Sequence, residues 1–297
     1  MTIGIPGVRV GHWTDAIGET GCSVVLFPEG TTASCEVRGG APASRELDVL
    51  APDKMVPCAD AAVLTGGSAF GLAAADGVMR FLEESGRGVP TPAGPVPIVP
   101  TLALFDLAVG NPAARPTAAN GYEAARAAAG LQVVSGRVGA GAGAYTAHWR
   151  GPGGRRPGGL TYAERRWDDL VVGALCVVNA YGDIDHGAAD IELDAVTQLH
   201  DIDLGARMHT TIGVVVTNAR LDKLGCQVVA QGAHDGLSRA LTPPHGRFDG
   251  DGFICAATGA VPADVDVVRL MALAAVTRAI RSVGPPHTRH TTTRRSL

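Results

Sequence analysis

The chain has 297 residues and a formal net charge of −4, with 46% hydrophobic and 18% charged residues. This composition excludes a mostly disordered chain, and the lack of a basic cluster before the C-terminal end argues against a nucleic-acid or anionic-membrane partner. No apolar run reaches the roughly 18 residues of a membrane span, no signal peptide is recognisable, and the six cysteines include no CxxC pair, so we expect a soluble cytoplasmic protein.

The first half of the chain alternates between short strands and helices. Strands rich in β-branched residues are predicted at residues 22–27, 31–37 and 61–67. Helices with a period of 3.6 residues are predicted at residues 68–86 and 116–130. Ser68 is predicted to be the N-cap of the first helix, and Gly86 to end it. Residues 92–107 are expected to be extended at first, because prolines punctuate them.

The second half is predicted to continue this alternation. Strands are expected at residues 170–183, 211–218 and 252–259, and helices at residues 221–241 and 264–284. Residues 152–166 are rich in Gly, Pro and Arg, which predicts a loop. Residues 184–208 form an irregular stretch much longer than the ~4–6 residues of ordinary loops, which indicates a functional or cleavable segment. The polar tail, residues 285–297, is expected to be disordered. These elements predict a single layered α/β domain over residues 1–284.

Three motifs suggest chemistry that their context does not support. "VGAGAGA" (138–144) nearly matches a dinucleotide fingerprint, but "YTAHWRG" follows instead of a helix, so these glycines are better explained by close backbone approach. "TGGSAFG" (65–71) resembles a nucleophile elbow, but Phe70 stands where the second glycine belongs. "DIDH" (183–186) and the scattered histidines lack zinc spacing. We therefore expect no cofactor and no metal.

Two other stretches remain open on residue chemistry alone. Thr210 and Thr211 stand directly before an apolar run, and Asp249 and Asp251 flank Gly250 before another strand. Threonine is β-branched and suits strands, and aspartates around a glycine commonly cap a turn. A purely structural interpretation is sufficient for each pair by itself.

Seven ordered blocks change that interpretation. They are "GVRVGHWTD" (7–15), "VRGGAPASRE" (37–46), "LTGGSAFGLAAADGVMRFLEE" (64–84), "VPIVPTLALFDL" (96–107), "RPTAANGY" (115–122), "TTIGVVVTNA" (210–219) and "AHDGLSRAL" (233–241). Together they resemble the family of L-aminopeptidase/D-esterases, β-peptidyl aminopeptidases and nylon-oligomer (6-aminohexanoate oligomer) hydrolases. The resemblance runs from about residue 3 to residue 262.

The resemblance implies a fold and a way of working. Members of this family have an α-β-β-α sandwich, related to that of ornithine acetyltransferase, and usually form homo-oligomers, here expected to be a tetramer or larger. They are made as one inactive chain, which cuts itself before a Ser or Thr that becomes the nucleophile of an amide hydrolase. The substrates implied are small peptides, amino-acid amides or esters and ω-amino-acid oligomers.

Carried over to this sequence, the resemblance assigns roles to individual residues. Thr210 matches the nucleophile, which implies self-cleavage after His209 into residues 1–209 and 210–297. Asp249 and Asp251 match the acidic pair of the nylon-hydrolase branch, and Asn179 matches the asparagine that stabilises the oxyanion. The implied chemistry is reasonable, because the α-amine freed by cleavage, with a pKa near ~8, is a base beside the threonine hydroxyl.

Two positions depart from the family pattern. His209 stands where Asn or Gly is frequent, and cleavage there benefits from a strained or left-handed backbone, which histidine tolerates better than most residues. His148 stands where the nylon-oligomer hydrolases carry a lysine near the acidic pair. We expect a changed substrate choice or pH optimum, since a histidine is charged only at mildly acidic pH unless the acids raise its pKa. An acyltransferase with the same nucleophile and an unprocessed binding or assembly protein remain alternatives.

Overall fold

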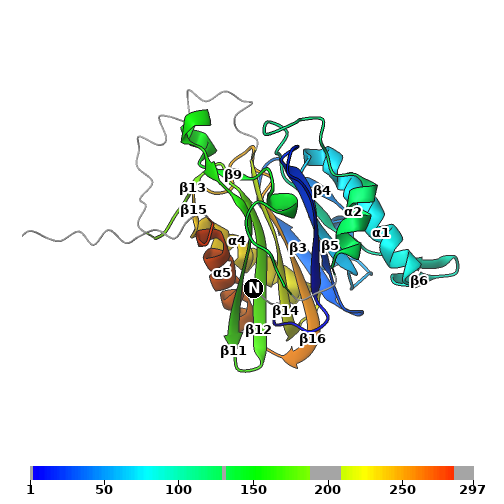
Figure 1. Ribbon diagram of the computed structural model, residues 1–297. Coiled ribbons are helices and arrows are strands. Elements are labelled where there is room, and N and C mark those ends of the chain that lie inside the picture. Colours follow the sequence, from blue (N-terminus) through cyan, green and yellow to red (C-terminus); the bar gives the residue numbers. More distant parts are fainter. Residues whose placement is uncertain (1–2, 129–131, 188–208, 284–297) are drawn as a thin grey trace, which may run out of the picture.

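The computed structural model describes residues 3–128, 132–187 and 209–283. Within them, two five-stranded sheets stack face to face, and a pair of helices covers the outer face of each sheet (Figure 1). This is the predicted α-β-β-α arrangement. Most of the long irregular stretch predicted at residues 184–208, and the whole of the tail predicted at 285–297, lie outside the described residues.

The first sheet comes from the N-terminal part of the chain. Its strand order is β1 (Arg9–Asp15), β2 (Thr20–Leu26), β5 (Ala61–Thr65), β8 (Thr101–Ala103) and β4 (Ala43–Arg45). Its pairs are antiparallel except for β5 and β8. The covering helices are α1 (Ala74–Glu84) and α2 (Ala118–Arg126). Thr117 and Asn120 form a capping box at the start of α2, which explains where that helix begins.

The second sheet carries the longest strands. Its order is β11 (Gly159–Trp167), β12 (Leu170–Asn179), β14 (Thr210–Arg220), β16 (Gly252–Pro262) and β3 (Thr32–Val37). Only β14 and β16 pair in parallel. The covering helices are α4 (Lys223–Ser238) and α5 (Val265–Arg281), which begin at side-chain caps from Asp222 and Asp264.

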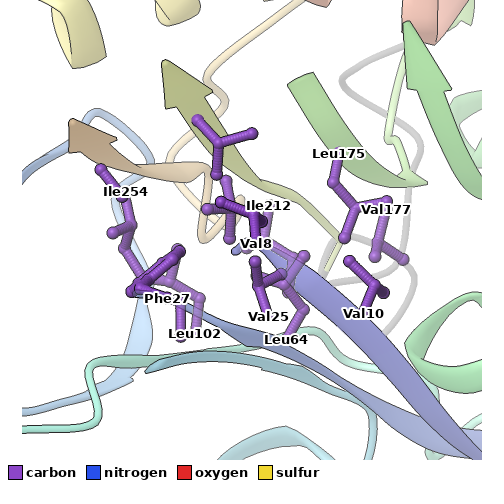
Figure 2. Close-up of a cluster of buried hydrophobic side chains, with 14 of the residues drawn as sticks. Val8, Val10, Val25, Phe27, Leu64, Leu102, Leu175, Val177, Ile212 and Ile254 are labelled. Atoms are coloured by element: carbon purple, nitrogen blue, oxygen red, sulfur yellow. The ribbon is translucent and has the colours of Figure 1, made fainter. Parts of the chain in front are cut away.

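The main core lies between the two sheets (Figure 2). Val25, Leu64 and Leu102 of the first sheet pack there against residues of the second sheet such as Ile212. Val215, on the opposite face of β14, packs toward the helices instead. Both faces of β14 are therefore covered, and the strand is buried from Thr210 to Ala219.

Short elements complete the described chain. The remaining strands are β6 (Val89–Thr91), β7 (Gly94–Val96), β9 (Tyr145–Thr146), β10 (Arg156–Pro157), β13 (Asp183–Ile184) and β15 (Leu241–Thr242). The 3₁₀ turns are η1 (Asp48–Leu50), η2 (Ser68–Ala73), η3 (Gly139–Gly141), η4 (His148–Arg150) and η5 (Pro152–Gly154). In the described parts of the chain, no helix is both long and apolar enough to cross a membrane.

The structure corrects two local predictions and supports a third. The loop predicted at 152–166 is wrong in its second part, because Leu160 and its neighbours are buried in β11 despite the Gly- and Arg-rich surroundings. Ser68 is not an N-cap: it has a left-handed backbone (φ +54°) inside η2, and α1 begins only at Ala74. The glycines of 138–144 do allow close approach, since a Cβ on Gly141 would lie 2.3 Å from the nitrogen of Leu160.

Candidate active site

The predicted site residues meet at one end of the second sheet. Thr210 is the first residue of β14 and lies opposite Asn179, the last residue of β12, in their antiparallel pairing. His209 forms an isolated parallel bridge with Asp249, shortly before β16 begins. All of these residues are buried, and so are Asp251 and His148. Residues from three distant parts of the sequence therefore surround the His209–Thr210 peptide bond.

One main-chain amide contacts both groups that a self-cleavage would involve. The N–H of Gly250 donates to the carbonyl oxygen of His209 and to Oγ1 of Thr210, each at 3.1 Å. A Cβ on Gly250 would lie 2.8 Å from that same Oγ1, so only glycine fits without displacing the hydroxyl. A donor in this position polarises the carbonyl and can stabilise an oxyanion that forms on it.

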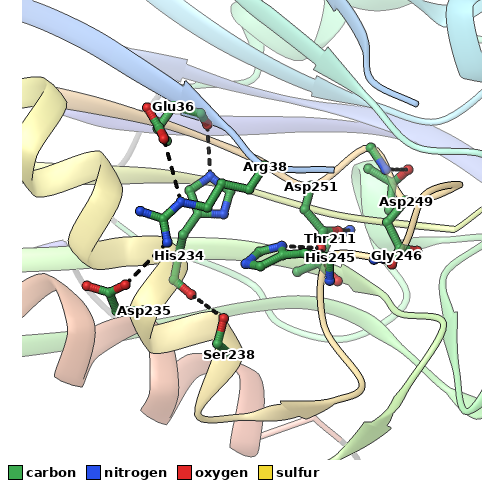
Figure 3. A network of polar contacts seen from close by, with 12 residues as sticks. Glu36, Arg38, Thr211, His234, Asp235, Ser238, His245, Gly246, Asp249 and Asp251 are labelled. Carbon is green, nitrogen blue, oxygen red and sulfur yellow. Dashed lines mark hydrogen bonds and ion pairs between the residues drawn. The ribbon is translucent and has the colours of Figure 1, made fainter. Parts of the chain in front are cut away.

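The two aspartates have different surroundings. Oδ1 of Asp251 accepts from the N–H of Thr211 at 2.7 Å, and its Oδ2 lies 3.3 Å from the nitrogen and 2.9 Å from Nδ1 of His245 (Figure 3). Asp249 accepts from the N–H of Gly246 through Oδ2, but its buried Oδ1 has no hydrogen-bond partner among the described residues. Burial, and then the charge of Asp251, raises the pKa of Asp249 to about 8. A carboxyl with such a pKa can both hold and accept a proton near neutral pH.

Residues 38–41, which follow β3, bind the main chain of the two aspartates. The amides of Arg38 and Gly39 donate to the carbonyl of Asp251, and the amide of Ala41 donates to the carbonyl of Asp249. A Cβ on Gly39 would lie 2.3 Å from the Asp249 carbonyl oxygen. The glycines of the "VRGGAPASRE" block are thus explained by the close approach of two backbones.

Asn179 is held by the main chain on its other side. Its Oδ1 accepts from the N–H of Tyr145, and its Nδ2 donates to the carbonyl of Phe105, each at 3.0 Å. The amide nitrogen carries a second hydrogen that these two bonds do not use. The donor observed on the His209 carbonyl is the Gly250 amide, so the sequence analysis missed a main-chain group at this point.

His148 lies against His209. The ring of His148 stacks on that of His209, with centroids 3.6 Å apart and planes at 25°. The ring of Tyr181 also stacks on that of His209, with centroids 5.8 Å apart. Burial, and then the neighbouring His209, lowers the pKa of His148 to about 3. His148 is therefore neutral at mildly acidic pH, contrary to the expectation of a charge there. The expected left-handed backbone of His209 depends on Met208, which lies outside the described residues.

Comparison with known proteins places this site in a family. Residues 3–284 match the family model described as Peptidase family S58.

The chain belongs to peptidase family S58.

Relatives and solved structures agree with that membership. This S58 peptidase is 41% identical to an "uncharacterized aminopeptidase" of Mycobacterium tuberculosis (strain ATCC 25618 / H37Rv), over 94% of this chain and 88% of the relative. It is 28% identical to a "6-aminohexanoate-oligomer endohydrolase" of Kocuria sp. (strain KY2), over 83% and 71%. The fold is similar to that of a Burkholderia sp. beta-aminopeptidase, with a TM-score of 0.71 and 20% identity over 93% of this chain and 84% of that one.

A second structural neighbour describes the fold type. The L-aminopeptidase D-Ala-esterase/amidase of Ochrobactrum anthropi has a TM-score of 0.72 and 18% identity, over 93% of this chain and 83% of that one. Its description calls it a variant of the Ntn-hydrolase fold. At these identities the likeness concerns the fold, while the family match makes the S58 chain a member of an aminopeptidase and amidohydrolase family.

Proposed function

We propose that this S58 peptidase cuts its own chain between His209 and Thr210 and then uses the freed Thr210 as the nucleophile of an amide hydrolase. The observation that carries the proposal is the Gly250 amide, which donates to the His209 carbonyl and to the Thr210 hydroxyl at once. The nucleophile and the carbonyl that it would attack are neighbours in the sequence and also share one donor in space.

Self-cleavage would proceed as an N→O acyl shift. Oγ1 of Thr210 attacks the carbonyl carbon of His209, the hydroxyl proton passes to the carboxylate of Asp249, and the Gly250 N–H stabilises the oxyanion. The C–N bond breaks, and Asp249 returns the proton to the nitrogen. Water then hydrolyses the ester, so that His209 ends as a carboxylate and Thr210 gains a free α-amine and regains its hydroxyl.

Turnover would reuse the same groups. The α-amine of Thr210 takes the hydroxyl proton as Oγ1 attacks a substrate carbonyl, and it then gives that proton to the leaving amine. The second N–H of Asn179 and the Gly250 amide serve as oxyanion donors. His148, stacked on His209, fixes the carbonyl side before cleavage without adding a charge.

The names of two relatives support a substrate class. One relative bears the name of an aminopeptidase and another that of a 6-aminohexanoate-oligomer hydrolase. We therefore propose that the enzyme hydrolyses amide or ester bonds of small peptides, amino-acid amides or ω-amino-acid oligomers. Aminoacyl p-nitroanilides are suitable assay substrates. A homo-oligomer, tetramer or larger, stays a prediction that light scattering of the purified protein can test. The cytoplasmic location also stays a prediction.

Denaturing mass spectrometry of a matched pair of variants tests the proposal. Thr210→Val removes the nucleophilic hydroxyl while keeping the side-chain shape, and should leave an uncut, inactive chain. Thr211→Val is the control, because the Thr211 hydroxyl is buried without a hydrogen-bond partner among the described residues. It should yield fragments 1–209 and 210–297 as the wild type does. A wild-type chain that stays whole and inert, or a Thr210→Val chain that is still cut there, would refute the proposal.

A further inference from the structure

His245 makes two contacts with one oxygen of the acid pair. It lies between β15 and β16, and both its main-chain nitrogen and its Nδ1 are within 3.3 Å of Oδ2 of Asp251 (Figure 3). The carboxylate can only accept hydrogen bonds, so Nδ1 must carry a proton and donate it. With the Thr211 N–H on Oδ1, Asp251 accepts three hydrogen bonds.

The backbone of His245 is shaped for this double contact. Its φ of +53° lies in the left-handed region, which residues other than glycine seldom adopt. Such conformations persist where the surroundings enforce them, and they are concentrated at functional sites. In this case the conformation brings the main-chain and side-chain donors of a single residue to the same oxygen.

We propose that His245 is a positioning residue that holds Asp251 as the carboxylate and thereby leaves the proton of the acid pair on Asp249. Hydrogen bonds to a carboxylate favour its charged form, and Asp251 receives three where Asp249 receives one. The proton then resides on Asp249, whose buried Oδ1 has no hydrogen-bond partner in the described parts of the chain. The inference rests on the proposed function, in which Asp249 moves the hydroxyl proton of Thr210.

The neighbouring charged groups leave this assignment intact near neutral pH. His234 of α4 lies with its ring 5.0 Å from that of His245, and burial lowers its pKa to about 4, so it is neutral. Its Nε2 donates to the carbonyl of Glu36 at 2.9 Å. Arg38 forms ion pairs with Glu36 and with Asp235 of α4.

One further charge comes from the acid loop itself. The guanidinium of Arg247 lies over the ring of Phe248, 5.5 Å from its centroid, and Arg247 is exposed to solvent. An arginine keeps its charge at all pH values of interest. Arg247 therefore contributes a constant charge to the acid loop.

Two substitutions separate the ring donor from the backbone shape. His245→Gly accepts the left-handed backbone and keeps the main-chain N–H, but it loses the Nδ1 donor. Asparagine, in His245→Asn, also tolerates that backbone, and its side-chain N–H nitrogen is bonded to Cγ as Nδ1 of histidine is. The pair thus compares loss of one hydrogen bond with its conservative replacement.

The first test is independent of self-cleavage. In Thr210→Val chains, carbon-13 NMR of labelled aspartate carboxyls, assigned with Asp249→Asn and Asp251→Asn, follows each carboxyl through pH. In the chain with His245 and in His245→Asn, Asp249 should keep its proton to a higher pH than an ordinary aspartate, while Asp251 is ionised throughout. With His245→Gly, both carboxyls should take part in that titration, and its midpoint should rise by roughly 0.3 pH unit, the shift for a proton that two sites share equally. Identical curves for His245→Gly and the histidine-containing chain would overturn the inference.

The second test uses the cleaving chain. The rate of appearance of fragment 210–297, followed by mass against pH, should rise around the pH at which Asp249 loses its proton. His245→Gly should move that rise upward, and His245→Asn should restore it. A slower rate with an unmoved profile, or an Asn variant that behaves like Gly, contradicts the inference. If the wild type is never cut, the proposed function fails, while the NMR experiment still decides the role of His245.

Discussion

The two sides of the His209–Thr210 bond are built from different interactions. On one side, the acid loop contacts the bond through hydrogen bonds, with the Gly250 amide on both reacting groups and the carboxylate of Asp251 one residue away. On the other side, His148 contacts His209 by ring stacking and carries no charge near neutral pH. In the proposed mechanism, proton transfer therefore belongs to the acid loop, while the stacked rings fix the shape of the carbonyl side.

The largest expected effect comes from separating the two aspartates. Asp251→Asn places its amide NH2 against either the Thr211 donor or the His245 donors, and should slow self-cleavage by ~10³ and lower the free energy of unfolding by about 2–3 kcal/mol. Asp249→Asn also removes a proton acceptor, costing ~10²–10⁴ in rate, but it has the shape of the protonated acid and should be at least as stable as the wild type near neutral pH. Urea unfolding and timed mass measurements distinguish the two, and equal stabilities would contradict this difference.

The next effect tests the shared amide donor. Gly250→Ala places a methyl group 2.8 Å from Oγ1 of Thr210 and 3.0 Å from the carbonyl of Ala41, so the hydroxyl must move. Cleavage should slow by ~10², comparable to the loss of one oxyanion donor. Gly153→Ala is the control, since nothing lies within 4 Å of a Cβ there and the residue is exposed. Unchanged cleavage in Gly250→Ala would remove the central contact from the mechanism.

A smaller effect concerns stability against pH on the acid side. The folded-state pKa of Asp249 is raised to about 8 from an ordinary 3.8, so the folded chain binds a proton that the unfolded chain has lost between these values. The wild type should therefore lose stability relative to Asp249→Asn as the pH rises through this window, by at most ~1.4 kcal/mol per pH unit. Thermal unfolding of both chains across the window measures the difference. Parallel stability curves would show that Asp249 is not held protonated.

The smallest effect concerns the stacked side. The folded-state pKa of His148 is lowered to about 3 from 6.5, so in this window the unfolded chain binds the additional proton. The contribution of His148 to the free energy of unfolding is fully present above about pH 6.5 and is lost as the pH falls toward 3. His148→Phe keeps an aromatic ring on His209 without titrating, and its stability should fall less in acid than that of the wild type. Self-cleavage near neutral pH should change by less than about tenfold, since the ring transfers no proton.

Much of this arrangement can be predicted from the sequence. Periodicity located β12, β14, β16 and the helices, and the resemblance supplied the layer order and the residues around Thr210. β1 was not predicted, because His12, Trp13 and Thr14 show no clear alternation of polar and apolar residues. β11 was not predicted, because a Gly- and Pro-rich stretch precedes it.

The missing parts of the site have a different physical cause. The Gly250 amide carries no side chain, so no residue type signals that it donates to His209 and Thr210. His245 contacts Asp251 through a left-handed backbone, which spacing along the chain does not show. The grouping of these side chains was thus predictable, whereas donors placed by backbone conformation required the fold.

Trapping with hydroxylamine tests the central claim most directly, because this reagent attacks an ester much faster than an amide. Freshly refolded chain, treated with hydroxylamine and analysed by denaturing mass spectrometry, should give faster cleavage, a fragment that begins at Thr210 with a free amine, and a hydroxamate on His209. Cleavage at another bond, or a cut after His209 that hydroxylamine neither accelerates nor labels, would show that the Thr210 hydroxyl does not attack its own chain.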